Sequence, residues 1–135
     1  MRIEPRFAES VPRVRVDPEQ FRRVIINLVD NAIEALNGAR EEGETAPAGR
    51  DEGLITIETH HDAANSVVRV SVADNGPGLP VGDRSKLFMP YYSTKGRGSG
   101  LGLAIVRRII AEHGGSIEAG DNEPHGTRFT IELPC

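Results

Sequence analysis

DPEQFRRVIINLVDNAIEAL, residues 17–36, predicts a long amphipathic helix. Asp17 is a suitable N-cap, Pro18 fits the first helical position, and Gln20 follows three residues after the cap. Apolar residues then recur at intervals of three and four, namely Phe21, Val24, Ile25, Leu28, Val29, Ala32, Ile33 and Leu36. We expect the helix to end near residues 37–38, an Asn-Gly pair, and its apolar stripe to supply much of the core.

The segments around this helix predict several strands and one further helix. Alternating apolar and polar residues predict strands at residues 2–7, 13–16, 54–61, 66–74, 115–120 and 126–133. A strongly apolar stretch that ends at two glycines predicts a helix over residues 101–113. Residues 38–53 lack apolar periodicity, so we expect a flexible loop there. Helices can cover only one face of such a sheet, which indicates an α+β fold, a two-layer α/β sandwich.

The bulk composition limits the classes of protein to consider. A chain of 135 residues suffices for one domain, and we treat residues 1–135 as a single unit. The net charge of −4 and an aromatic content of 4% disfavour a surface that binds nucleic acid. No apolar run reaches the roughly 18 residues of a membrane span, so we expect a cytoplasmic domain. Cys135 is the only cysteine, and we therefore expect no internal disulfide and no cysteine-based metal cluster.

Polar residues line one side of the predicted helix. Four of them are spaced by three and four positions and share a face beside the apolar stripe, namely Asn27, Asp30, Asn31 and Glu34. Asparagine oxygens are hard, neutral ligands suited to Mg²⁺, which takes oxygen donors together with waters and phosphates. The alternative is an ordinary solvated helix face, which these spacings alone do not exclude.

Two glycine-containing segments are further candidates for a ligand site. DNGPG at 74–78 directly follows a strand, where Asp74 can accept a hydrogen bond from an exocyclic amine, although the same letters also describe a generic turn. KGRGSGLGL at 95–103 runs into the second helix, so successive N–H groups and a helix N-terminus can face phosphate oxygens. This segment matches neither the Walker A loop nor the dinucleotide-binding spacing.

Five short motifs together resemble the N, G1, F, G2 and G3 boxes of the catalytic domains of bacterial sensor histidine kinases. In order they are NLVDNAIEAL (27–36), DNGPG (74–78), LFMPYYSTK (87–95), GSGLGL (98–103) and GT (126–127). The likeness runs from about residue 12 to 134. It is most similar to the nitrogen-regulation branch of these kinases, the NtrY/NtrB type.

The resemblance implies a Bergerat fold, with a mixed, mostly antiparallel sheet, helices on one face and a mobile ATP lid over residues 88–100. At the base end, Asp74 would bind the adenine amine and Thr127 would contact the adenine side. Gly76 and Gly78 would let the base approach the backbone. An acceptor-only carboxylate at this position predicts a preference for ATP over GTP.

The resemblance also implies a metal and phosphate end. Asn31 would ligate Mg²⁺, Asn27 would support the metal or the phosphates, and Lys95 would provide charge near the γ-phosphate. Backbone N–H groups at the end of the lid would bind the phosphates of ATP, those of Gly98, Gly100, Leu101 and Gly102.

The implied activity is transfer of the γ-phosphoryl group to a histidine on a separate dimerisation domain, which this chain lacks. None of the chain's histidines, at 60, 61, 113 and 125, lies in a phosphoacceptor-like motif. A response regulator would act downstream, and the parent protein would be a homodimer that can be anchored in the inner membrane.

Other readings of the same motifs remain open. ATPases related to gyrase, Hsp90 and MutL carry a glutamate base at the position of Asn27, and an amide cannot accept a proton from water. Anti-sigma serine kinases share similar boxes and are small free-standing domains. A nucleotide-binding module without transfer activity is the third alternative.

Overall fold

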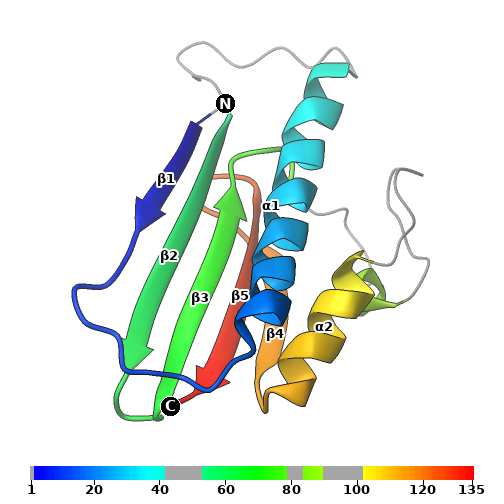
Figure 1. Ribbon diagram of the computed structural model, residues 1–135. Helices are drawn as coiled ribbons and strands as arrows, with labels where there is room; N and C mark the ends of the chain where they lie inside the picture. Colours follow the sequence, from blue (N-terminus) through cyan, green and yellow to red (C-terminus); the bar gives the residue numbers. More distant parts are fainter. Residues whose placement is uncertain (1, 42–52, 79–83, 90–101) are drawn as a thin grey trace.

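Five strands form one mixed sheet, and helices cover one of its faces (Figure 1). The computed structural model describes residues 2–41, 53–78, 84–89 and 102–135. The elements in chain order are β1 (Arg2–Arg6), α1 (Pro18–Glu41), β2 (Leu54–Asp62), β3 (Val67–Asp74), the 3-10 helix η1 (Arg84–Phe88), α2 (Gly102–Glu112), β4 (Ser116–Asp121) and β5 (Thr127–Pro134).

The sheet has the strand order β1-β2-β3-β5-β4. β1 runs parallel to β2, and the other neighbouring pairs are antiparallel. α1 and α2 pack against each other and against the same face of the sheet (Figure 1). The expected α+β sandwich with a mostly antiparallel sheet is therefore confirmed.

The start of α1 follows the local sequence signals. The side-chain oxygen Oδ1 of Asp17 accepts hydrogen bonds from the backbone N–H groups of Glu19 and Gln20, at 2.9 and 3.3 Å. This is the N-cap arrangement that satisfies otherwise unpaired donors in the first turn. The apolar stripe of the helix is buried as predicted, with Val24 and Leu28 both at 0% exposure.

Two predictions about the ends of elements are wrong. α1 continues to Glu41 instead of ending at residues 37–38, because one glycine costs about 1 kcal/mol and the next residues are good helix formers. The first part of the loop predicted at 38–53 is thus helical, and residues 42–52 lie outside the described part. Residues 13–16 form no strand. Their alternation arises because Val14 and Val16 pack on the core in a connecting segment that has no strand partner.

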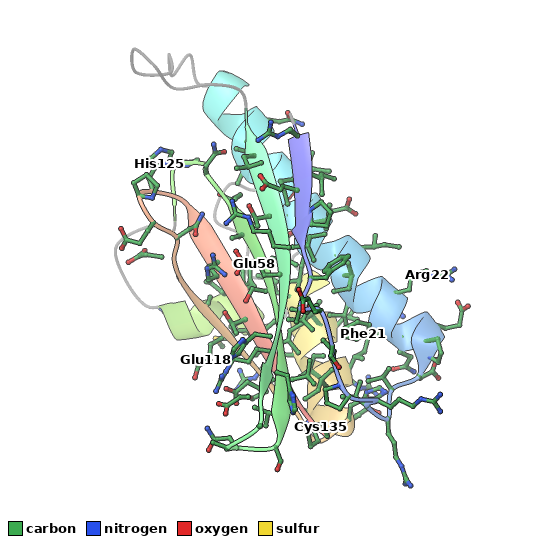
Figure 2. The ribbon with its side chains drawn as sticks, turned by 90° about the vertical axis from the view of Figure 1, so that its left-hand side faces the viewer. Phe21, Arg22, Glu58, Glu118, His125 and Cys135 are labelled. Carbon is green, nitrogen blue, oxygen red and sulfur yellow. The ribbon has the colours of Figure 1, made fainter. Side chains whose placement is uncertain are left out.

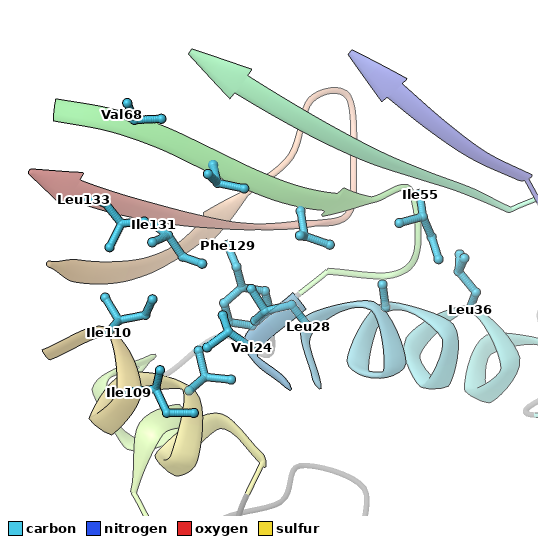
Figure 3. Close-up of a cluster of buried hydrophobic side chains, with 14 residues drawn as sticks. Val24, Leu28, Leu36, Ile55, Val68, Ile109, Ile110, Phe129, Ile131 and Leu133 are labelled. Carbon is cyan, nitrogen blue, oxygen red and sulfur yellow. The ribbon is translucent and has the colours of Figure 1, made fainter. Parts of the chain in front are cut away.

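The core lies between the helices and the inner face of the sheet (Figure 3). β3 and β5 contribute alternate residues to it, so that pairs such as Val70 and Ile131 stand side by side. α2 adds Ile109 and Ile110 from the helix side, below these strands in Figure 3. None of the described helices is long and apolar enough to cross a membrane.

His113 connects the end of α2 to the start of α1. Its Nε2 accepts a hydrogen bond from the backbone N–H of Asp17 at 3.0 Å, and its Nδ1 lies 2.7 Å from the carbonyl oxygen of Ile109. The second contact requires Nδ1 to carry the hydrogen, which fixes the tautomer of the ring. The pairing of both ring nitrogens is consistent with a structural role for this histidine.

The outer face of the sheet carries a ladder of charged side chains (Figure 2). Arg69 of β3 pairs with Asp62 at 2.9 Å and with Glu132 at 2.8 Å. Arg128 of β5 pairs with Glu58 of β2 at 3.5 Å. Charges of both signs cover this face, so the apolar side of the sheet is the one that faces the helices.

Shortening Leu28 should strongly destabilise the domain. Leu28→Ala removes a fully buried side chain from the α1–sheet interface, and we expect it to lower the free energy of unfolding by about 2–5 kcal/mol. Ile26→Ala in the same helix is the matched control, since Ile26 is 52% exposed and should change stability by less than about 1 kcal/mol. Urea denaturation followed by circular dichroism measures both, and equal effects would contradict the packing described.

Candidate functional site

Asp74 is a buried carboxylate at the end of β3. It lies opposite Ile55 in the sheet register, on the side that faces the helices, and is only 4% exposed. Its Oδ1 accepts hydrogen bonds from the backbone N–H groups of Gly76 at 2.9 Å and Thr127 at 3.4 Å. Two segments far apart in the sequence therefore hold one oxygen of this carboxylate in place.

Burial raises the pKa of the Asp74 carboxyl above its ordinary value. The N–H groups of Gly76 and Thr127 act in the opposite direction, because they stabilise the ionised form. The positive charge of His125 also lowers this pKa. A desolvated carboxyl with specific partners is a candidate functional group, which makes Asp74 the leading site residue.

The turn between β4 and β5 closes against the loop that follows Asp74. A side chain at Gly126, which has φ +115°, would overlap the carbonyl oxygen of Asp74. Gly78 has φ +89°, and a Cβ there would lie 3.3 Å from the carbonyl oxygen of Gly126. Asn122 adds a hydrogen bond from its Nδ2 to the carbonyl oxygen of Asp74 at 2.9 Å. The backbones thus touch directly, and only glycine fits at position 126.

The loop 74–78 also lies beside α1. A Cβ on Gly76 would be 3.5 Å from the side chain of Leu36 and 3.8 Å from the backbone of Ala35. At the other end, a Cβ on Gly102, the first residue of α2, would be 3.5 Å from Oδ1 of Asn27. Eight residues separate Asn27 from Ala35, which corresponds to about 12 Å along a helix. One face of α1 therefore connects the Asp74 loop to the start of α2.

Asn31 lies between these two ends of the α1 face. Its Nδ2 is buried and has no hydrogen-bond partner among the described residues. Asn27 and Asn31 are half-buried, whereas Asp30 and Glu34 are exposed. The polar face predicted from the sequence is therefore divided, because only its two asparagines turn toward the site.

Several predicted site residues lie outside the described part of the chain, namely Lys95, Gly98, Gly100 and Leu101. The same holds for the predicted lid at 88–100 beyond its first two residues.

Phe88, at the start of the predicted lid, packs edge-on against Phe129 of β5 with ring centroids 6.2 Å apart. The guanidinium carbon of Arg107 in α2 lies 5.8 Å from the Phe88 centroid. The start of this segment is therefore anchored to the sheet and to α2.

The sequence did not single out Asn122 or His125 as site residues. Asn122 binds the backbone of Asp74, and Nδ1 of His125 lies 3.3 Å from the carbonyl oxygen of Gly76. Each contact joins positions 48 or 49 residues apart, so local sequence patterns carry no signal for it. The GT motif at 126–127 was the nearest sequence marker.

A buried acceptor at a strand end and amide groups on the adjoining helix are groups that can bind a nucleotide in an α+β domain. Residues 16–135 match the family described as histidine kinase-, DNA gyrase B-, and HSP90-like ATPase. The chain belongs to this family, and over nearly its whole length it is similar to the catalytic domains of sensor histidine kinases.

The similar proteins are sensor histidine kinases. The chain is 34% identical over 134 residues to the sensor histidine kinase ZraS of Escherichia coli strain K12, covering 98% of this chain and 26% of ZraS. It is 38% identical over 137 residues to the sensory histidine kinase/phosphatase NtrB of Rhizobium leguminosarum bv. phaseoli, covering 100% of this chain and 35% of NtrB. The chain therefore spans roughly a quarter to a third of these relatives.

Solved structures show the same fold. The catalytic domain of histidine kinase ThkA in a nucleotide-free form superposes with a TM-score of 0.75 at 37% identity, covering 98% of this chain and 80% of that one. Full-length ShkA in complex with AMPPNP gives a TM-score of 0.75 at 30% identity, covering 98% of this chain and 25% of ShkA. The predicted resemblance to histidine kinase catalytic domains is confirmed.

A side chain at position 126 should push the β4–β5 turn away from the Asp74 loop. We expect Gly126→Ala to lower the free energy of unfolding by about 1–3 kcal/mol and to speed amide hydrogen exchange at Thr127. Gly120→Ala is the matched control, because a Cβ at Gly120 has nothing within 4 Å. If Gly126→Ala were as stable as Gly120→Ala, the close backbone contact would be wrong.

Neutralising Asp74 should stabilise the free domain. Because burial raises the pKa of Asp74, the folded state binds its proton more readily than the unfolded chain does, and stability falls as the pH rises through that range. Asp74→Asn keeps an acceptor oxygen without the charge. We expect a higher free energy of unfolding than wild type at about pH 8, with the difference shrinking at lower pH.

The matched control for Asp74→Asn is Asp62→Asn. Hydrogen bonding from Asn65 is the main cause that lowers the pKa of Asp62, so its ionised form favours folding. This substitution should change stability in the opposite direction at the same pH. Urea unfolding over a range of pH measures both variants, and an Asp74→Asn protein that is less stable than wild type at about pH 8 would refute the assignment.

Proposed function

We propose that the chain binds Mg-ATP along the inner face of α1 and donates the γ-phosphoryl group to a histidine on a separate dimerisation domain. The observation that carries this proposal is the α1 face that joins Gly76 beside Ala35 to Gly102 beside Asn27. A base beside Gly76 and phosphates beside Gly102 fit this arrangement, with Asn31 between them.

At the base end, the Asp74 carboxylate would accept a hydrogen bond from the adenine amine. Gly76 and Gly78 would lie beside the base and, without side chains, would let it approach the backbone, and Thr127 lies against the same carboxylate. Guanine presents a carbonyl oxygen where adenine presents an amine, so an acceptor-only carboxylate would be left unpaired. Such a mismatch can give discrimination of up to roughly 10⁴-fold.

The asparagines of α1 fit a magnesium ion that is shared with the nucleotide. Mg²⁺ commonly takes few protein oxygens and completes its shell with phosphates and waters. The residues that the structure describes hold no group of three or more His, Cys, Asp or Glu that could bind a metal by itself. The unpaired amide of Asn31 is a buried polar group that a metal-bound nucleotide can satisfy, and Asn27 lies one turn away.

The start of α2 fits the phosphate end. α2 begins at Gly102, where the absence of a side chain lets the backbone approach Asn27. A helix N-terminus offers free N–H groups and a positive dipole to phosphate oxygens. The preceding residues Gly98, Gly100 and Leu101 would add further N–H groups, and Lys95 would add charge.

Transfer rather than hydrolysis is the reaction that these side chains favour. Phosphoryl transfer needs little covalent help, so positioning and charge neutralisation are the main contributions of the protein. Asn27 occupies the place of a glutamate base in the related ATPases, and an amide cannot take a proton from water. The nucleophile must therefore be presented by another domain.

The phosphate acceptor would be a histidine of the dimerisation domain of the same kinase, with a response regulator downstream and a homodimeric parent protein. Within the described residues, His113 has both ring nitrogens in hydrogen bonds, and His125 faces the Gly76 carbonyl. His60 and His61 lie in β2. These positions support a structural role or a role in the site, and not a role as phosphate acceptor.

A nucleotide titration tests the site. We expect Asn31→Ala to weaken binding of Mg-ATP by about tenfold or more, as the loss of a metal-site residue commonly does. When EDTA replaces Mg²⁺, the difference in ATP affinity between Asn31→Ala and wild type should shrink. Asp74→Ala should weaken ATP binding by about 10- to 150-fold with or without the metal, the value for a hydrogen bond to a charged group. Isothermal titration calorimetry measures these affinities, and GTP serves as the second ligand.

The matched control is Asn37→Ala, which makes the same change at an exposed position of α1. Unchanged binding by both site variants would show that the nucleotide lies elsewhere.

Phosphoryl transfer is tested by adding a histidine-bearing helical hairpin, or a serine-bearing protein acceptor, to the ATP-loaded chain. Acid-labile phosphohistidine supports the proposal, phosphoserine would indicate the anti-sigma class, and no product would indicate a binding module.

A further inference from the structure

The β4–β5 turn holds the loop 74–78 through two side chains. Asn122 donates to the carbonyl oxygen of Asp74 at 2.9 Å, and His125 lies 3.3 Å from the carbonyl oxygen of Gly76 through its Nδ1. The N–H of the same Gly76 donates to the Asp74 carboxylate at 2.9 Å. His125, labelled in Figure 2, therefore contacts the carbonyl side of the residue whose N–H holds the carboxylate.

The ring of His125 can keep this contact in both of its charge states. A carbonyl oxygen only accepts, so Nδ1 must carry a hydrogen, and it does so in one neutral tautomer and in the imidazolium form. His113 differs, because its Nε2 accepts a hydrogen bond from the backbone N–H of Asp17. Protonation of His125 thus adds a positive charge beside the site without losing the hydrogen bond to Gly76.

That charge acts on Asp74. Burial raises the pKa of the Asp74 carboxyl, and within the described residues His125 is the charged side chain that lowers it. Other charged groups lie around the site: Asp121 and Glu123 near the same turn, Glu34 on the exposed side of α1, and Arg128 paired with Glu58 on the outer face of the sheet. His125 is the titratable group among them that contacts the Asp74 loop.

We propose that His125 is a positioning and affinity-determining residue of the base site, which holds the loop 74–78 in place through the Gly76 carbonyl and brings a ring that can carry a positive charge to this loop. This inference rests on the proposed binding of adenine by Asp74. Its consequence is that the domain keeps an ionised, correctly oriented acceptor at a lower pH than the buried site would otherwise allow. ATP binding by this chain thereby resists acidification.

The charge effect can be measured on the free domain without nucleotide. His125→Asn places an amide nitrogen where Nδ1 lies, so it can still donate to Gly76 but carries no charge. In a pH titration of the Asp74 carboxyl carbon by NMR, the midpoint should move to higher pH in His125→Asn than in wild type. His60→Asn is the matched control, since His60 is exposed on β2, and it should leave the midpoint unchanged. Coincident titrations of wild type and His125→Asn would overturn the proposal.

The binding consequence is measured with ATP and Mg²⁺ in the same variants. At about pH 8, His125→Asn should bind within about twofold of wild type, whereas His125→Ala, which cannot donate to Gly76, should be weaker by about 2- to 10-fold. At about pH 5.5 the affinity ratio of wild type to His125→Asn should grow by about 1.5- to 5-fold, as for one solvent-screened charge pair. Wild type and His125→Asn bind the same nucleotide, so protonation of its phosphates changes both affinities equally and leaves their ratio unchanged.

The outcomes separate this inference from the proposed function. If Asp74→Ala weakens binding as expected but the wild-type and His125→Asn pH profiles are parallel, the charge of His125 has no role in recognition, and this inference fails while the proposed function stands. If His125→Asn shifts the Asp74 titration while Asp74→Ala binds ATP normally, the electrostatic coupling is real, but the base site and the positioning role both fail. At about pH 8, near-wild-type binding by His125→Asn together with weaker binding by His125→Ala would show that the hydrogen bond to Gly76 matters. A general loss of stability would weaken binding by both variants.

Discussion

The direct backbone contact between the β4–β5 turn and the end of β3 is the constraint on which the site depends. Gly126 lies so close to the carbonyl oxygen of Asp74 that no side chain fits between them. This approach brings the N–H of Thr127 to the Asp74 carboxylate and excludes water from it. The position and the desolvation of the carboxylate therefore have one structural cause, and His125 reaches the loop only because the turn is held there.

α1 connects this strand-end arrangement to the rest of the fold. Its fully buried residues, such as Leu28, fix the helix against the sheet, while Asn27 and Asn31 on the adjacent side remain available to the site. Since both sets lie on one rigid helix, the packing of the core determines how far the asparagines lie from Asp74. The His113 bond to Asp17 further ties α2 to the start of α1, so the N-terminus of α2 is positioned by the same core.

The sequence predicts best what is decided locally or carried by contiguous motifs. The N-cap of α1 was predictable because Asp17 bonds to residues two and three positions away, and the DNGPG motif marked Asp74 at its strand end. The end of α1 was predicted too early, because a single glycine is a weak stop when good helix formers follow it. The strand predicted at 13–16 was wrong, because Val14 and Val16 pack on the core without a strand partner. Asn122 and His125 could not be found, since their partners lie on a distant strand end.

The proposed recognition of adenine accounts for a carboxylate at position 74, whereas folding alone does not. An asparagine would satisfy the N–H groups of Gly76 and Thr127 without a buried charge, so the native residue works against stability whenever it is ionised. An amide, however, presents both a donor and an acceptor and could pair with the carbonyl of guanine as well as with the amine of adenine. A carboxylate accepts only, and its burial leaves a wrong partner without water to compensate. Burial of this acceptor-only carboxylate thus destabilises the fold and would also make the site selective for adenine. A nearby side chain that can carry a positive charge, such as His125, would offset part of the destabilisation.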